Sequence, residues 1–155
     1  MWQALIGYGP WDGTAVLHGF LGSALLLNYG ALLEALWAGR HLGRLRMLTA
    51  AQVVLTTVTV GAGMHLVTGY RAPGGAKAFF LAHRPELHRF AFEFKEYLAP
   101  MTVPLVVTAA YLVWSAAAYL PEARRAVLAC VLLAFAFTVT AFGLGALMAR
   151  TMGVH

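Results

Sequence analysis

Long apolar runs, separated by short basic or glycine-rich stretches, make up most of this chain. Four of these runs reach about 20 residues or more, which is the length that an α-helix needs to cross the hydrocarbon core of a bilayer. They lie at about 14–38, 47–69, 98–120 and 125–149. The pattern therefore predicts an all-α integral membrane protein, a bundle of four transmembrane helices that forms a single membrane domain over residues 1–155.

The long segment between the second and third runs has a helical pattern of its own. After Pro85, which suits the first position of a helix, apolar residues recur every three or four positions and charged residues form a second stripe. We therefore expect an extra amphipathic segment at about 76–97, with a helix over residues 86–97. This helix is expected either to lie on the membrane surface or to extend the third membrane helix outward.

The composition agrees with a membrane protein, because 61% of the residues are hydrophobic and only 11% are charged. Soluble domains are about 25% charged. The net charge of +5 at pH 7 does not point to nucleic acid, since the basic residues lie in the breaks between the apolar runs. In the two shortest breaks these residues are Arg40, Arg44, Arg46, Arg124 and Arg125.

The arginines of the two short breaks predict how the chain sits in the membrane. Short loops that are rich in lysine or arginine face the cytoplasm. We therefore expect these two loops on the cytoplasmic side of a bacterial inner membrane. Both chain ends and the long connector are then expected on the non-cytoplasmic side.

Four of the six histidines are expected at the non-cytoplasmic end of the bundle. His18 lies near the start of the first helix, and His65 lies near the end of the second. Because successive membrane helices run antiparallel, the two residues fall at similar depth. His83 and His88 come from the connector at the same end. Ionisable residues in membrane segments are candidates for a functional site.

Two glycines accompany the histidines of the membrane helices. Gly22 follows His18 by four residues, and Gly61 precedes His65 by four residues. Each glycine is therefore expected one turn deeper than its histidine, on the same helix face. Such glycines either allow close helix packing or leave room for a flat ring between the two histidines.

A b-type haem fits this pattern, since histidine is a usual axial ligand of haem iron. We expect His18 and His65 as the ligands, with His88 as the alternative to either. Arg71 and Arg84 lie on the correct side to meet the haem propionates. No Cys-x-x-Cys-His motif occurs in the sequence, which excludes covalent attachment through that motif.

A copper or iron site without haem is the second possibility for these histidines. Such a site needs three or four protein ligands. His18, His65, His83 and His88 would supply them.

The arrangement of four helices, with histidines on the first two and before the third and a short basic loop after the first, resembles small membrane-anchored b-type cytochrome subunits. The resemblance implies histidine ligands on transmembrane helices and electron transfer between quinone and other membrane or periplasmic redox subunits. It also implies an electron-transfer role rather than a catalytic one.

A structural or assembly subunit without a cofactor is the alternative function. In that case the histidines serve only packing and hydrogen bonding. The aromatic connector, which holds Phe79, Phe80, Phe90, Phe92 and Phe94, would then contact a partner protein or lipid.

Overall fold

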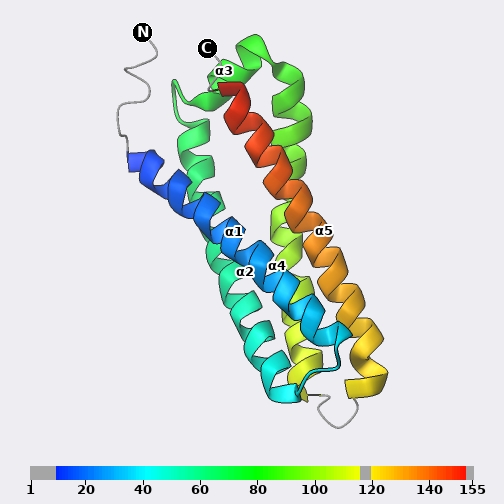
Figure 1. Ribbon diagram of the computed structural model, residues 1–155. Helices are drawn as coiled ribbons and strands as arrows, with labels where there is room; N and C mark the ends of the chain where they lie inside the picture. The colour runs from blue at the N-terminus through cyan, green and yellow to red at the C-terminus, as the bar shows by residue number, and fades with distance from the viewer. Residues whose placement is uncertain (1–9, 116–119, 153–155) are drawn as a thin grey trace.

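The computed structural model describes residues 10–115 and 120–152, and these residues are helical apart from short turns. Four long helices form an elongated bundle (Figure 1): α1 (Pro10–Trp37), α2 (Leu42–Arg71), α4 (Glu93–Ser115) and α5 (Leu120–Met152). A short helix, α3 (Ala76–His83), and a π-helical turn, η2 (Leu87–Phe92), join α2 to α4.

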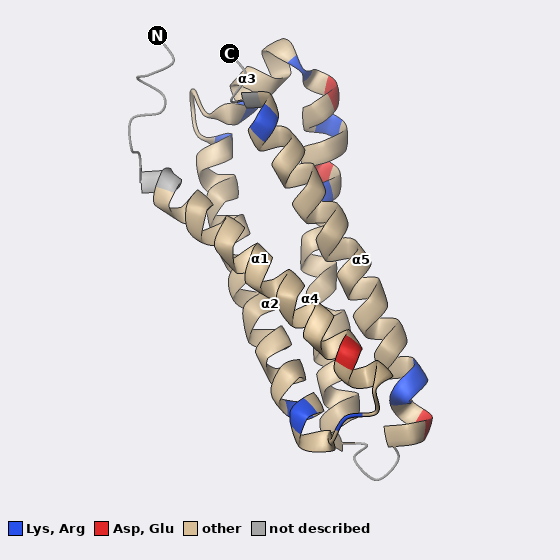
Figure 2. Cartoon of the chain, in the orientation of Figure 1, with Lys and Arg blue, Asp and Glu red and all other residues tan. Residues whose placement is uncertain are grey.

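The two ends of the bundle differ. One end carries α3, η2, the start of α1 and the end of α5, and we name it the connector end (Figure 1). The opposite end carries the turn between α1 and α2 and the start of α5, and we name it the loop end. Charged side chains gather toward the two ends and leave most of the middle of the bundle uncharged (Figure 2).

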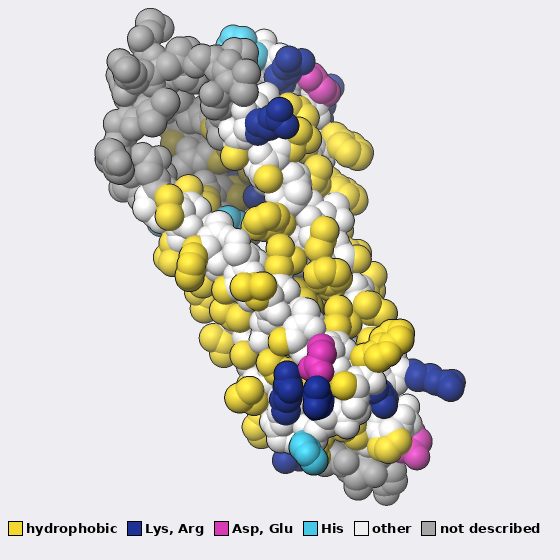
Figure 3. Space-filling view, viewed as in Figure 1, with side chains coloured by type: hydrophobic (Ala, Val, Ile, Leu, Met, Phe, Trp, Pro, Cys, Tyr) yellow, Lys and Arg dark blue, Asp and Glu magenta, His cyan; other side chains and the backbone are white. Residues whose placement is uncertain are grey.

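The predicted set of long apolar helices is confirmed. Four helical segments are long and apolar enough to cross a membrane, and they cover Gly13–Trp37, Leu42–Arg71, Leu87–Ser115 and Leu120–Thr151. Their outer faces are as apolar as their inner faces, and hydrophobic side chains cover the face that Figure 3 shows. A helix that is apolar on all sides is typical of a membrane span.

The helix ends extend further than the apolar runs. α2 begins at Leu42 rather than near residue 47, and α5 begins at Leu120 rather than near residue 125. Arg124 and Arg125 therefore lie in the first turns of α5 and not in a loop. Pro121 does not prevent this, because proline is tolerated in the first turn of a helix. α4 ends at Ser115, and residues 116–119 of the predicted third helix lie outside the described residues.

The connector contains two helical pieces, of which the second covers the helix expected over residues 86–97 and the first, α3, was not expected as a separate helix. α3 ends at His83, and Arg84 leaves the helical conformation with φ −148° and ψ 61°. A residue before proline avoids the helical region, so Pro85 accounts for the break. After it, η2 continues directly into α4. The second piece thus extends the third long helix, which confirms one of the two predicted alternatives.

The interior of the bundle is tightly filled toward the loop end. Tyr29 and Leu32 of α1 pack with Val106 of α4 and Val131 of α5, and each of these side chains is at most 1% exposed. α1 ends at Trp37, and Gly39 adopts a φ of +66°, which favours glycine and lets the chain turn toward α2.

The packing predicts different costs for two leucines on α1. Leu32 is fully buried, whereas Leu27 is 77% exposed on the outer face. We expect Leu32→Ala to lower the free energy of unfolding by about 2 kcal/mol or more, because it leaves a cavity in the core. We expect Leu27→Ala to change it little. Denaturant unfolding of the detergent-solubilised protein, followed by circular dichroism, measures both values. Equal losses of unfolding free energy in the two variants would contradict the assignment of Leu32 to the inner face of α1 and Leu27 to the outer face.

Candidate functional site

His18 lies on the side of α1 that faces α2, and its imidazole is held by the backbone of that helix. Nδ1 is 3.0 Å from the carbonyl oxygen of Thr59, so the Nδ1–H group donates a hydrogen bond to it. The ring also lies close to Gly63, where a Cβ atom would stand 3.0 Å from Cε1 of the imidazole. This contact fixes the ring and its tautomer, and it makes Nε2 the nitrogen with the available lone pair.

Lys95 enters the same region from α4. Its ammonium group is near enough to His18 that a positive charge on the imidazole would be repelled by it, and a Cβ atom at Gly145 of α5 would stand 2.9 Å from Nζ. The ion pairs among the described residues join Arg40 and Arg44 to Glu34 and Arg71 to Glu96, so they leave Lys95 without an acidic partner.

Each long helix therefore contributes one residue to this part of the connector end. We name His18, Gly63, Lys95 and Gly145 the four-helix site. The two basic side chains come from α1 and α4, and each lies beside a glycine of a neighbouring helix. A larger side chain at either glycine would compete with the basic group for the same space.

His65 and Gly61 lie on a different side of α2. Both residues are exposed, and no atom would lie within 4 Å of a Cβ atom at Gly61. Val58, which lies three residues before Gly61 and so on the same face of α2, is 48% exposed. The prediction that this face of α2 meets α1 is wrong. Residues two positions apart are about 200° apart around a helix, so a helix that turns Thr59 inward turns Gly61 outward.

Gly22 faces inward as predicted, but a protein side chain already lies against it. A Cβ atom at Gly22 would stand 3.1 Å from the ring of Phe142 on α5. This glycine therefore allows α1 and α5 to approach each other, which is a common use of glycine in membrane helices.

His88 is buried at the connector end, within the π-helical turn η2. Its Nδ1 atom is 2.9 Å from the hydroxyl oxygen of Tyr70 on α2. The Tyr70 ring stacks on Phe92 with ring centroids 3.9 Å apart, and Phe80 of α3 closes the cluster. π-helical turns occur frequently at functional sites. The position of His88 makes it the second histidine, after His18, that points into this end of the bundle.

The other predicted site residues lie nearer the surface. His83 is exposed, and its Nδ1–H group donates to the Phe79 carbonyl of its own helix at 3.0 Å. Arg71 donates to Glu96 at 2.7 Å, and Arg84 is exposed. Within residues 10–115 and 120–152, no group of three or more His, Cys, Asp or Glu side chains is placed to hold a metal ion. The four histidines are therefore not assembled into one metal site.

Sequence reasoning missed Lys95 and Tyr70. Lys95 was hidden among the charged residues of the connector, although it lies two positions from Glu93 and so falls on another face of the helix. This two-residue spacing from Glu93 was the signal in the sequence that Lys95 does not belong to the charged surface stripe. Tyr70 gave no signal, because an aromatic residue at the end of a membrane helix is ordinary.

A cluster of polar side chains, separate from the four-helix site, lies midway along the bundle. Asn28 of α1 donates to the Leu48 carbonyl at 3.2 Å and to the Gln52 side-chain oxygen, and Tyr29 lies 3.4 Å from the Thr138 hydroxyl. Nε2 of Gln52 is buried without a hydrogen-bond partner among the described residues. These contacts tie α1 to α2 and α5 through their polar residues.

No family model matches this chain, and neither a curated protein nor a solved structure is detectably similar to it.

The glycines of α2 give a matched test of the four-helix site. We expect Gly63→Ala to lower the melting temperature relative to Gly61→Ala, because only the first places a Cβ atom against the His18 ring. Both variants gain similar helix propensity, so the comparison isolates the contact. Thermal unfolding of the two variants in one detergent measures the difference. A lower melting temperature for Gly61→Ala would show that the face of α2 is assigned wrongly.

Proposed function

We propose that this chain is a membrane b-type cytochrome subunit that passes electrons within a larger redox complex. The haem would lie at the connector end. The observation that supports this most is the His18 imidazole, whose Nδ1–H group donates to the Thr59 carbonyl. Histidines that ligate metals usually donate their other ring N–H group in this way, which directs the free nitrogen lone pair toward the metal.

His88 is our choice for the second axial ligand, in place of His65. His88 is 7% exposed, whereas His65 lies on the outer face of α2. Its Nδ1–H group can donate to the Tyr70 oxygen, and Nε2 is then the ligating nitrogen. On α2, His18 contacts Gly63 and His88 contacts Tyr70. These two residues of α2 are seven positions apart, or about 10 Å along the helix axis.

Cationic side chains at this end suit the acidic groups of a haem. Lys95 is half-buried near His18 and has no acidic partner among the described residues, so a propionate would neutralise it. Arg84 is exposed and would act at the surface, while Arg71 is paired with Glu96. When bound, the haem iron would supply one-electron redox chemistry. The chain's own residues would orient the ring and set its electrostatic surroundings.

The partners would approach from the membrane or from the non-cytoplasmic side. Phe90, Phe94 and Tyr97 form an outward aromatic stripe along η2 and α4, and each is at least 44% exposed. The stripe suits a neighbouring subunit, quinone or lipid. We place the chain in a bacterial inner membrane, and the arginines of the loop end support an orientation with that end in the cytoplasm and both chain ends outside it.

A structural or assembly subunit without a cofactor is the second candidate. Phe142 already lies against Gly22, and Tyr70 already binds His88, so protein side chains occupy much of the connector end. A copper or iron site is third, because the described residues bring no three ligands together.

A reduced-minus-oxidised visible spectrum of the purified protein tests the haem proposal. We expect a b-type α band in the wild type and its loss in His18→Ala and His88→Ala. We expect His65→Ala and His83→Ala, which change exposed histidines, to keep the band.

The same spectra distinguish the alternatives. Loss of the band in His65→Ala but not in His88→Ala would overturn our ligand assignment. It would mean that α2 is rotated about its axis so that His65 faces the interior of the bundle. A folded protein without haem, isolated with its partner subunits, would favour the structural candidate. Copper or iron without an α band would favour the third candidate.

Cysteine labelling in intact cells tests the membrane orientation. We expect Ala82→Cys, at an exposed position of α3 in the connector, to react with a membrane-impermeant maleimide, and His41→Cys, in the loop-end turn, to react only after the membrane is permeabilised. The background is Cys130→Ala, which removes the native thiol. Reversed labelling would mean that the arginine-rich loop end is outside.

A further inference from the structure

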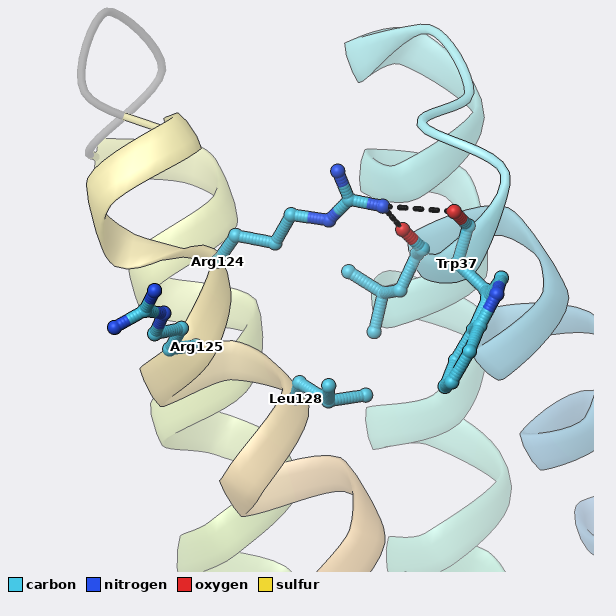
Figure 4. A pocket seen from close by; sticks show the side chains of 5 residues that line it. Trp37, Arg124, Arg125 and Leu128 are labelled. Atoms are coloured by element: carbon cyan, nitrogen blue, oxygen red, sulfur yellow. Dashed lines mark hydrogen bonds between the residues drawn. The ribbon is translucent and has the colours of Figure 1, made fainter.

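A cavity of about 250 Å³ lies between the end of α1 and the start of α5, at the loop end. Its lining consists of Leu36, Trp37, Arg124, Arg125 and Leu128. Figure 4 shows the Arg124 side chain reaching from α5 to the α1 backbone, with Leu128 and the Trp37 ring pointing toward one another across the gap. The Arg124 guanidinium spans the cavity, whereas the exposed Arg125 guanidinium points away from Trp37 and borders the cavity from the outer side of α5.

The two arginines have different roles in this cavity. Arg124 donates hydrogen bonds to the backbone carbonyls of Leu36 and Trp37 at the end of α1. It therefore ties α5 to α1. Arg125 is exposed and takes part in none of the ion pairs of the described residues. Glu34, which is on α1 near this end, is already paired with Arg40 and Arg44.

The rest of the lining is suited to the glycerol and acyl part of a lipid. Leu36 is buried, and Leu128 is half-buried between the helices. Trp37 is 84% exposed at the end of a membrane-length helix, where tryptophan commonly lies at the headgroup level. A free phosphate ion would use only the arginines and would gain nothing from these apolar side chains.

We infer that this cavity binds one anionic phospholipid of the cytoplasmic leaflet. The phosphate would lie at the outer edge of the cavity, where the exposed Arg125 side chain would swing toward it, and the glycerol and upper acyl chains would lie along Leu128 and Trp37. Basic pockets between transmembrane helices on the cytoplasmic side bind anionic headgroups in this way. The inference depends on the membrane insertion and orientation given under the proposed function, and it does not depend on haem.

Native mass spectrometry of the full chain in detergent, titrated with phosphatidylglycerol or phosphatidylcholine, tests the inference. We expect tighter binding of phosphatidylglycerol. We expect Arg125→Gln to weaken it about fivefold, as for the loss of one interfacial cation. Arg150→Gln is the matched control, because it removes the same charge from the opposite end of α5 and should leave the affinity unchanged. Arg124 is left intact, since it holds α1.

A second variant tests the apolar wall without changing the charge. Trp37→Ala removes an exposed side chain, so the fold should survive, and phosphatidylglycerol should bind more weakly. Equal affinities for wild type and Arg125→Gln would overturn the inference, as would full competition by soluble glycerol phosphate. The haem spectrum of Arg125→Gln should equal that of the wild type, so failure here is distinguishable from failure of the haem proposal. The cysteine labelling tests the orientation separately.

Discussion

The approach of His18 to the α2 backbone at Thr59 and Gly63 is the contact on which the connector end depends. A hydrogen bond of 3.0 Å fixes the ring, and the missing side chain at Gly63 gives it space. Lys95 can enter from α4 only because Gly145 leaves similar space on α5. In a membrane, apolar side chains gain little by leaving lipid for the protein interior, so close approaches at small residues largely decide how helices meet.

The apolar pattern of the sequence was sufficient to predict the helices and insufficient to predict which face of each helix turns inward. Run length predicts the four long helices, and Pro85 predicts where η2 begins. The rotation of α2 could not be read from hydrophobicity, because this helix is apolar on both sides: Val54 is 61% exposed, whereas Leu48 is buried. Gly61 and His65 are four residues apart and so share one face of α2, but this spacing does not determine whether that face turns inward or outward.

Polar residues, rather than apolar ones, mark the inner side of α2. Thr49, Gln52, Thr56 and Thr59 are all buried, and they recur at spacings of three, four and three residues. Continuing this series by four residues reaches Gly63, which is the glycine beside His18. The physical reason is that polar side chains in a membrane helix avoid lipid and seek partners within the bundle, as Gln52 does with Asn28. The same reasoning from the sequence would have chosen Gly63 over Gly61.

The two ends of the bundle use their cations differently. At the loop end, Arg124 donates to carbonyls at the end of α1 and Arg46 donates to the Trp114 carbonyl of α4, so these arginines join the ends of neighbouring helices. At the connector end, Lys95 lies half-buried beside His18, and no carboxylate of the described residues pairs with it. A buried ammonium group without a counter-charge is costly in apolar surroundings. An acidic group from a bound molecule would remove that cost, and this is the physical basis for our proposal that the four-helix site is part of a cofactor site.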